Sequence, residues 1–198
     1  MKYVVFGVPG VGKTSVIKGV TEKTAINHIH WGDLSFEIAQ EKGFVQDRDE
    51  VRRLNLEKQY EVKVAVGERI AEMTNDGKDA LIETHAAVKT PQGYMPGFSI
   101  NTINRVKPDT FIVIEADPEF VFQRRLMDST RWRKDDTSLS DVEESIRVTR
   151  NMAMTNAVLA VGTVVFIENK EGDLDYAVNR IVELIEQGRL KMDHLGAI

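Results

Sequence analysis

The 198-residue chain contains no cysteine, only four histidines and no long apolar run. Without cysteine it can form no disulfide, no thiolate nucleophile and no zinc site that uses Cys ligands. The histidines are scattered, without the spacing typical of a metal site. An absence of cysteine fits a reducing compartment. No apolar segment approaches the roughly 18 residues that a membrane-spanning helix requires.

Positive charge is also scarce, since 26 Lys and Arg residues stand against 31 Asp and Glu residues. The resulting net charge of −5 disfavours nucleic-acid binding through a broad basic surface. The amino-terminal segment MKYVVFGVPG is too short for a signal peptide and lacks a small-residue cleavage site. We therefore expect a soluble, cytoplasmic protein whose partners are neither nucleic acids nor membranes.

The composition, 42% apolar and 29% charged, is typical of a single globular domain. Short apolar runs predict strands at residues 2–6, 28–31, 80–82, 110–115 and 164–168. Periodic segments and cap residues predict helices at 13–22, 34–41, 49–75, from 117–118 onward and at 173–186. Because Pro and Gly punctuate residues 85–98, we expect a loop there, and we expect residues 188–198 to be frayed. Strands separated by helices imply parallel pairing, so the predicted fold class is α/β, with a doubly wound sheet of about five parallel strands.

The strongest signal is a phosphate loop, GVPGVGKT, which lies at residues 7–14 between the first predicted strand and the first predicted helix. Glycines let backbone N–H groups turn toward phosphate oxygens, and the amino terminus of the helix adds partial positive charge. Lys13 would place its ammonium on the β- and γ-phosphates, and the Thr14 hydroxyl would reach Mg²⁺. The predicted ATP-binding residues are Gly7, Val8, Pro9, Gly10, Val11, Gly12, Lys13, Thr14 and Ser15. The alternative is a glycine-rich turn with a solvated lysine.

A second signal is a basic segment in this acidic chain, where five Lys or Arg residues lie within the eleven positions 124–134. We interpret it as a mobile lid whose arginines, Arg124, Arg131 and Arg133, close over the transferring phosphates. Cations suit that place because negative charge spreads over the phosphate oxygens in the transition state. The alternative is a solvated helix face with ion pairs such as Glu143 to Arg147.

These two segments, together with WGD at 31–33, DRDEVRRL at 47–54 and ETHAAVKTPQGYMPG at 83–97, resemble the archaeal-type adenylate kinases. The resemblance covers residues 2–187. It implies a P-loop NTPase-like sheet with a nucleoside-monophosphate-binding segment at about residues 30–60 and a short lid at about 130–137. It also implies reversible phosphoryl transfer from MgATP to AMP, giving MgADP and ADP, and a homotrimer.

The same resemblance implies roles for individual residues. Asp33 begins the monophosphate-binding segment. Arg124 lies against ATP where the lid begins, and Arg133 contacts phosphate where the lid ends. Asn169 to Gly172 resemble the loop that cups adenine.

One departure from the family pattern concerns the acceptor phosphate. Phe36 stands where many monophosphate kinases carry an arginine that holds this phosphate. Arg48 and Arg52, four residues apart, are therefore the candidate cations, with Lys89 and His85 behind them. Phe36 also leaves other acceptors open, namely CMP, UMP or a metabolite hydroxyl, and for a hydroxyl Asp33 would be the candidate base.

A second departure is Glu83, at a strand end where many phosphate-loop kinases carry Asp. We expect it to hold a Mg²⁺-bound water, the alternative being an ordinary strand-end carboxylate. For His85 we expect polar positioning or an ordinary loop hydrogen bond, because a phosphate acceptor is already anionic and needs no general base. His28, His30 and His194 are assigned no functional role. A nucleotide switch or RNA-associated NTPase is disfavoured by the acidic charge and by the lack of a guanine-reading N-K-x-D motif.

Overall fold

The computed structural model describes residues 1–90, 93–127 and 138–195. Five parallel strands form one sheet, namely β1 (Lys2–Phe6), β2 (Asn27–His30), β3 (Ala80–Glu83), β6 (Thr110–Glu115) and β7 (Thr163–Glu168). Their order across the sheet is β2-β3-β1-β6-β7, so β1 lies at the centre. The predicted α/β fold with a doubly wound, five-stranded parallel sheet is confirmed.

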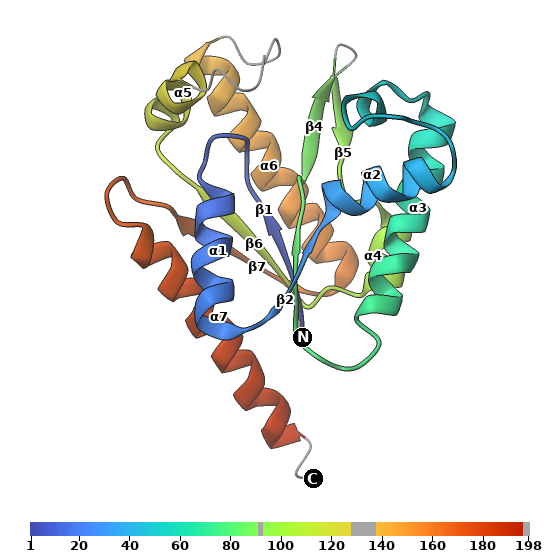
Figure 1. Cartoon of the computed structure of the whole chain (residues 1–198). Coiled ribbons are helices and arrows are strands. Elements are labelled where there is room, and N and C mark those ends of the chain that lie inside the picture. The colour runs from blue at the N-terminus through green and yellow to red at the C-terminus, as the bar shows by residue number, and fades with distance from the viewer. Residues whose placement is uncertain (91–92, 128–137, 196–198) are drawn as a thin grey trace.

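Helices cover both faces of the sheet (Figure 1). On one face lie α1 (Lys13–Thr24) and α7 (Leu174–Leu195), and on the other lie α2 (Trp31–Glu41), α3 (Leu56–Met73), α4 (Ile100–Val106) and α6 (Leu139–Ala160). Successive side chains of a strand point to opposite faces of the sheet. Tyr3 and Val5 therefore pack in the core beside α1 and α7, while Val4 and Phe6 pack in the core on the opposite face. Because all five strands are parallel, their carboxyl ends lie along the same side of the sheet, where β1, β3, β6 and β7 lead into loops.

The helix expected after Asp117-Pro118 is confirmed as α5 (Pro118–Met127). The Asp117 carboxylate accepts a hydrogen bond from the Glu119 N–H at 2.8 Å, which satisfies one of the free donors of the first turn. α2 ends where we expected, because Gly43 has a left-handed φ of 68° that lets the chain leave the helix.

The single helix expected at residues 49–75 is wrong. The segment begins as a short 3₁₀ helix, η1 (Asp49–Arg53), and α3 starts only at Leu56. Leu54 is extended, with ψ 146°, and the Asn55 side chain accepts a hydrogen bond from the Lys58 N–H at 2.9 Å. Asn55 thus caps a new helix instead of continuing the previous one.

The loop expected at residues 85–98 is also wrong in part, because it contains an antiparallel hairpin, β4 (Ala87–Thr90) and β5 (Gly93–Pro96). Gly93 has φ 123°, and the Thr90 hydroxyl donates to its carbonyl at 2.8 Å, which closes the ribbon. Pro96 is tolerated because it is the last residue of a two-stranded ribbon. The sequence analysis missed α4, for which Ser99 is the signal, since its side chain accepts from the Thr102 N–H.

The frayed end expected at residues 188–198 is wrong as far as Leu195, where α7 ends. Gly188 lies inside this helix at the point where α7 passes Tyr3 and Met1. A Cβ atom at Gly188 would collide with the Tyr3 hydroxyl and the Met1 sulfur. The missing side chain therefore allows the helix to continue across the sheet at a position where glycine would ordinarily suggest its end.

Candidate functional site

The phosphate loop connects the central strand β1 to α1. Gly10 and Gly12 both have φ +87°, a left-handed conformation that residues with a Cβ atom rarely adopt. A Cβ atom at Gly12 would collide with the Asn169 side chain. The two glycines are therefore required by backbone conformation, and Gly12 also by close packing. Lys13 is the first residue of α1, as we predicted.

Two other segments hold this loop in place. The Asn169 amide, directly after β7, donates to the Val11 carbonyl at 2.8 Å. The Arg125 guanidinium, on α5, donates from Nε to the Pro9 carbonyl at 2.7 Å. Both Asn169 and Arg125 are buried. Asn169 was expected at the adenine, so its contact with the phosphate loop is a further role. The role of Arg125 was not expected from the sequence, where its place beside Arg124 was the available signal.

At the centre of the site the Lys13 ammonium contacts Glu83, the last residue of β3. The distance from Lys13 Nζ to Glu83 Oε1 is 2.6 Å, and the two residues are 8% and 4% exposed. The other carboxylate oxygen lies 3.2 Å from His28 Nε2, on the neighbouring strand β2. Burial alone would raise the pKa of Glu83, but the hydrogen bond from His28 and the charge of Lys13 outweigh it and lower the pKa to about 2. Glu83 is therefore ionised at neutral pH.

His85 follows two residues after Glu83. Burial, the nearby Lys13 ammonium and the Arg52 guanidinium lower its pKa to about 3. At neutral pH the imidazole is therefore uncharged, so it offers a neutral hydrogen bond rather than a positive charge. The uncharged imidazole is not an additional cation for an acceptor phosphate, and it fits both the positioning role and the ordinary loop hydrogen bond expected for His85.

The start of α2 and the chain before η1 meet at Asp33. His30 caps α2, because its Nδ1 accepts a hydrogen bond from the Asp33 N–H at 3.2 Å. Arg48 Nη1 donates to the Asp33 carboxylate at 2.5 Å, and this ion pair is exposed to solvent. Arg52, within the 3₁₀ helix η1, lies close enough to His85 for its positive charge to help lower the His85 pKa. Phe36 packs against the core, and its apolar ring offers a phosphate neither a charge nor a hydrogen-bond donor.

Lys89, on β4, contacts acidic residues of α6. Its Nζ lies 3.0 Å from Asp141 Oδ1 and 3.7 Å from Glu144 Oε2. Tyr94, on β5, also donates to Glu144, at 3.1 Å. The hairpin is thus bound to the first turns of α6, and the Lys89 charge faces that helix.

On the opposite side of the phosphate loop, Arg124 forms an ion pair with Glu171. A Cβ atom at Gly12 would lie 3.7 Å from Arg124 Nη1, so this guanidinium reaches the phosphate loop. Gly172, next to Glu171, has φ +75° in the tight turn before α7. Thr14 and Ser15 are exposed in the first turn of α1. Arg131 and Arg133, with the whole of the lid expected at about 130–137, lie outside the described residues.

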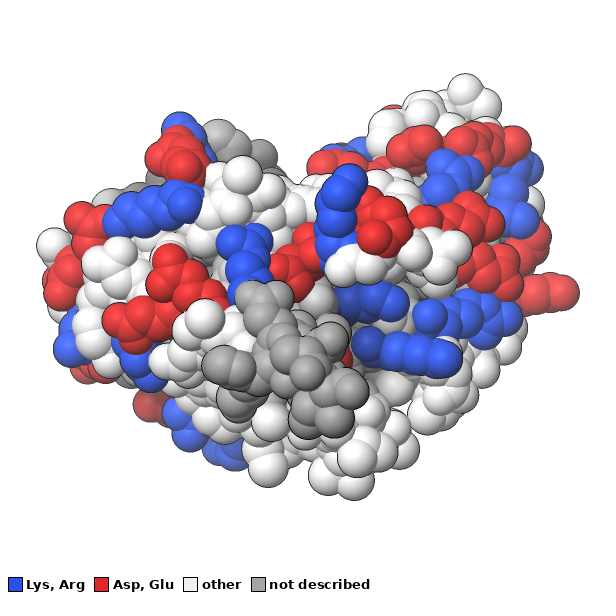
Figure 2. Space-filling model, turned by 90° about the horizontal axis from the view of Figure 1, so that it is seen from below, with Lys and Arg blue, Asp and Glu red and all other residues white. Residues whose placement is uncertain are grey.

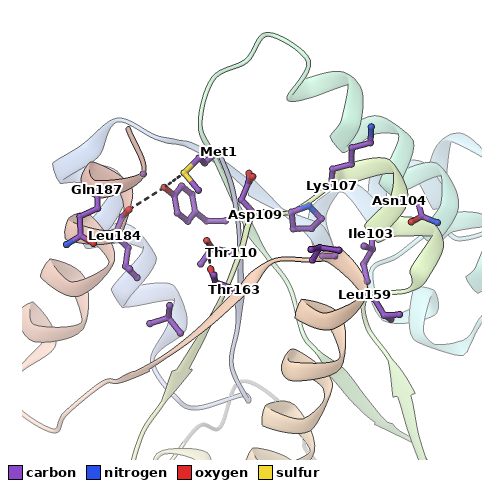
Figure 3. Close-up of a pocket in the computed structure, with 16 residues that line it drawn as sticks. Met1, Ile103, Asn104, Lys107, Asp109, Thr110, Leu159, Thr163, Leu184 and Gln187 are labelled. Atoms are coloured by element: carbon purple, nitrogen blue, oxygen red, sulfur yellow. Dashed lines mark hydrogen bonds between the residues drawn. The ribbon is translucent and has the colours of Figure 1, made fainter. Parts of the chain in front are cut away.

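A pocket of about 560 Å³ lies elsewhere, at the amino-terminal ends of the strands. Asp109, Thr110, Thr163 and Leu184 are among the residues that line it (Figure 3). Figure 2 views the molecule from this end, and basic and acidic side chains are interspersed over the face it shows. The phosphate loop follows the carboxyl end of β1, so this pocket is not part of the candidate site.

Within the described ranges, no three His, Asp or Glu side chains are grouped closely enough to hold a metal ion alone. None of the helices in the described part of the chain has the length and apolar character needed to cross a membrane.

Comparisons with known proteins agree on one family. A family model described as an AAA domain matches residues 6–147. The adenylate kinase of Methanopyrus kandleri is 39% identical over 93% of this chain and 98% of that relative. The adenylate kinase of Thermoplasma volcanium is 36% identical over 94% of this chain and 100% of the relative, and that of Methanocaldococcus jannaschii is 38% identical over 92% and 97%.

Solved structures show the same fold at much lower identity. The shikimate kinase of Acinetobacter baumannii superposes with a TM-score of 0.56 at 17% identity, and covers 96% of this chain and 94% of its own. A sugar kinase from Janibacter superposes with a TM-score of 0.55 at 15% identity, over 93% and 94% of the two chains. At these identities the likeness concerns the fold alone.

Proposed function

This chain belongs to the adenylate kinase family of phosphotransferases, with an AAA-type domain, and from that premise we propose that it transfers a phosphoryl group reversibly from MgATP to AMP, giving two ADP. The observation that carries the proposal is a complete phosphate loop, ending in the buried Lys13, within a chain that matches adenylate kinases over 93% of its length. ATP and AMP are then the two substrates.

We assign the ATP phosphates to residues 7–15. The Lys13 ammonium neutralises β- and γ-phosphate oxygens, and Arg124 adds charge from α5. Asn169 and Gly172 form the edge of the adenine site, because Asn169 is already bonded to the phosphate loop. Charges placed around the transferring group in this way lower the barrier by positioning and electrostatics.

We assign AMP to the segment at about residues 30–60 and to the start of the hairpin. Arg48 and Arg52 supply positive charge for its phosphate, while Asp33 orients Arg48 through their ion pair. The neutral His85 orients the acceptor. Lys89, which also pairs with Asp141 of α6, adds positive charge on the acceptor side. The short lid at residues 130–137, with Arg131 and Arg133, completes the charge over the transferring group and excludes water.

The residues present fit a magnesium ion that is held partly through water. Thr14 presents an exposed hydroxyl beside Lys13, and Glu83 is ionised, and hydroxyl and carboxylate oxygens are the ligands that Mg²⁺ prefers. When bound, the ion would neutralise phosphate charge. The chain's own part is to hold the Glu83 carboxylate and the Thr14 hydroxyl at the carboxyl edge of the sheet.

We further propose that the protein is cytoplasmic and assembles as a homotrimer. The apolar side chains at the end of α6, Met154, Val158, Leu159 and Val161, support assembly, because Val158 is 75% and Val161 95% exposed. An exposed apolar patch of this kind is typical of an interface. Light scattering after size-exclusion chromatography should give three times the chain mass, and a monomeric mass would overturn this part.

The reaction is tested by a phosphoryl-transfer assay with MgATP and each of AMP, CMP, UMP and GMP, beside an ATP-only control. We expect two ADP per AMP consumed and slow hydrolysis without an acceptor. CMP and UMP belong in the panel because Phe36 stands where many monophosphate kinases carry an arginine for the acceptor phosphate. Transfer to any acceptor other than AMP at the higher rate would refute the proposed acceptor. ATP loss without any acceptor, at a rate comparable with transfer, would refute the transferase itself.

A further inference from the structure

The Glu83 carboxylate lies between two donors that come from different elements. Lys13, at the start of α1, contacts one oxygen, and His28, in the middle of β2, contacts the other. Because the carboxylate is paired with the Lys13 ammonium and can then only accept hydrogen bonds, His28 Nε2 carries the hydrogen and donates it. Sequence reasoning gave His28 no role, since its contact with Glu83 depends on how β2 and β3 are aligned.

The two donors differ in how firmly they are placed. Lys13 reaches Glu83 through a long, flexible side chain, and the proposed function requires the same ammonium at the phosphates of ATP. His28 projects from a strand that is paired with β3, in a register that sets His28 opposite Leu81, two residues before Glu83. A nucleotide can therefore draw Lys13 away from Glu83 but leaves His28 where it is.

Removing a hydrogen-bond donor from a buried carboxylate costs free energy, because the charged group is left partly unsatisfied. Glu83 is only 4% exposed, so water cannot readily replace the ammonium. Among the described residues, His28 is the donor that remains when Lys13 turns to the phosphates. Glu83 also has one more rotatable bond than the aspartate common at this position, so it needs more restraint to keep one orientation.

We propose that His28 is a positioning residue that holds the Glu83 carboxylate at the end of β3 and so frees the Lys13 ammonium to bind nucleotide phosphates. The inference deepens the proposed function, because it rests on Lys13 binding ATP. It predicts that removing the His28 donor weakens ATP binding, although His28 itself need not touch ATP. Without His28, Glu83 depends on Lys13 alone and competes with the phosphates for it.

The test is ATP binding by isothermal titration calorimetry, with EDTA present and no acceptor, so that neither magnesium nor turnover enters. We expect His28→Leu to raise the Kd for ATP by roughly tenfold, which corresponds to one hydrogen bond to a charged group. His28→Gln retains an N–H donor of similar reach and should restore the Kd to within about twofold. Asn27→Ala, an exposed change on the same strand, is the matched control and should leave the Kd unchanged.

A Glu83→Gln background shows whether His28 acts through Glu83. There the competing charge is gone, so adding His28→Leu should change the Kd by less than about twofold. A thermal scan of each variant reports folding separately, and we expect His28→Leu to lower the Tm by about 2–4 °C.

Two results would overturn the proposal. One is an unchanged Kd in His28→Leu beside a lowered Tm, which would make the contact merely structural. The other is an equal loss of affinity with and without the Glu83 charge. A failure of the proposed function is distinguishable, because it appears as absent transfer to AMP while this ATP-binding comparison still gives its answer. If His28→Leu fails to fold, two measurements decide instead. One is the Kd for ATP of His28→Gln, and the other compares the Kd of Glu83→Gln with that of the Glu83→Gln, His28→Leu double variant.

Discussion

Acid should destabilise this protein through Glu83 more than through any exposed carboxylate. The pKa of Glu83 is about 2 in the folded chain, against 4.5 for an unperturbed Glu, because the His28 and Lys13 hydrogen bonds outweigh burial. A depressed folded pKa contributes stability that is present above pH 4.5 and is lost as the pH falls toward 2. The difference of 2.5 units between these two pKa values corresponds to about 3 kcal/mol at pH 7. About 2 kcal/mol of this is lost by pH 3.

The assay is urea unfolding of the nucleotide-free protein at a series of pH values from 7 to 3, with the free energy of unfolding extrapolated to water. Glu83→Gln should be less stable at pH 7, because the buried Lys13 ammonium loses its counter-charge. Its stability should nevertheless fall less steeply with acid than that of the unmodified chain, since the titrating group is gone.

Glu37→Gln is the matched control, because Glu37 also pairs with a cation, Arg69, but is exposed. Exposed pairs contribute about 0–1 kcal/mol, so this variant should keep the parent's pH dependence. Equal slopes for the unmodified chain and Glu83→Gln between pH 5 and pH 3 would refute the reasoning.

The remaining predictions concern the phosphate loop, the proposed lid and one cap. Lys13→Ala should lower kcat by at least about 10² while circular dichroism shows an unchanged fold, because it deletes a transition-state charge; near-normal turnover would remove Lys13 from the mechanism. Gly12→Ala should lower the Tm by about 4 °C or more, since it combines a left-handed φ with a collision against Asn169, and a calorimetric scan showing no change would contradict that geometry. Arg133→Ala should lower kcat more than it changes the KM for AMP, and an unaltered kcat in steady-state assays would exclude Arg133 from the lid's chemistry. Ser99→Ala should cost about 1 kcal/mol in urea unfolding through loss of the α4 cap, whereas a parental stability would show that the cap contributes little.

Local patterns were enough to predict most of the sheet. The run at 110–115 has four consecutive apolar residues at its centre and became β6. The phosphate loop between an apolar run and a periodic segment became the turn from β1 to α1. Asp117 and Pro118 marked the start of α5 because their preferences are local. In each case a few neighbouring residues determine the conformation.

The errors arose where a single polar residue or a distant contact decides the structure. Asn55 interrupts a helical pattern by capping a new helix, and periodicity does not register one such hydrogen bond. Residues from Gly188 onward were expected to be frayed, although Gly188 lies within α7 and its missing side chain is required by Tyr3, 185 positions earlier. His28 and Glu83 meet only through the register of two strands 55 positions apart. Arg131 and Arg133 remain predictions, since they lie outside the described residues.

The hydrogen bond from Asn169 to Val11 also has a consequence for how the protein is made. It joins residues 158 positions apart, and Asn169 follows β7, the strand at one edge of the sheet. During synthesis from the amino terminus, the phosphate loop emerges early, yet one of its two holding contacts cannot form until the last strand has joined the sheet. Chains released before residue 169 would therefore have an incompletely held phosphate loop. Competence to bind nucleotide would then mark a nearly finished chain, acquired at the end of folding rather than at its beginning.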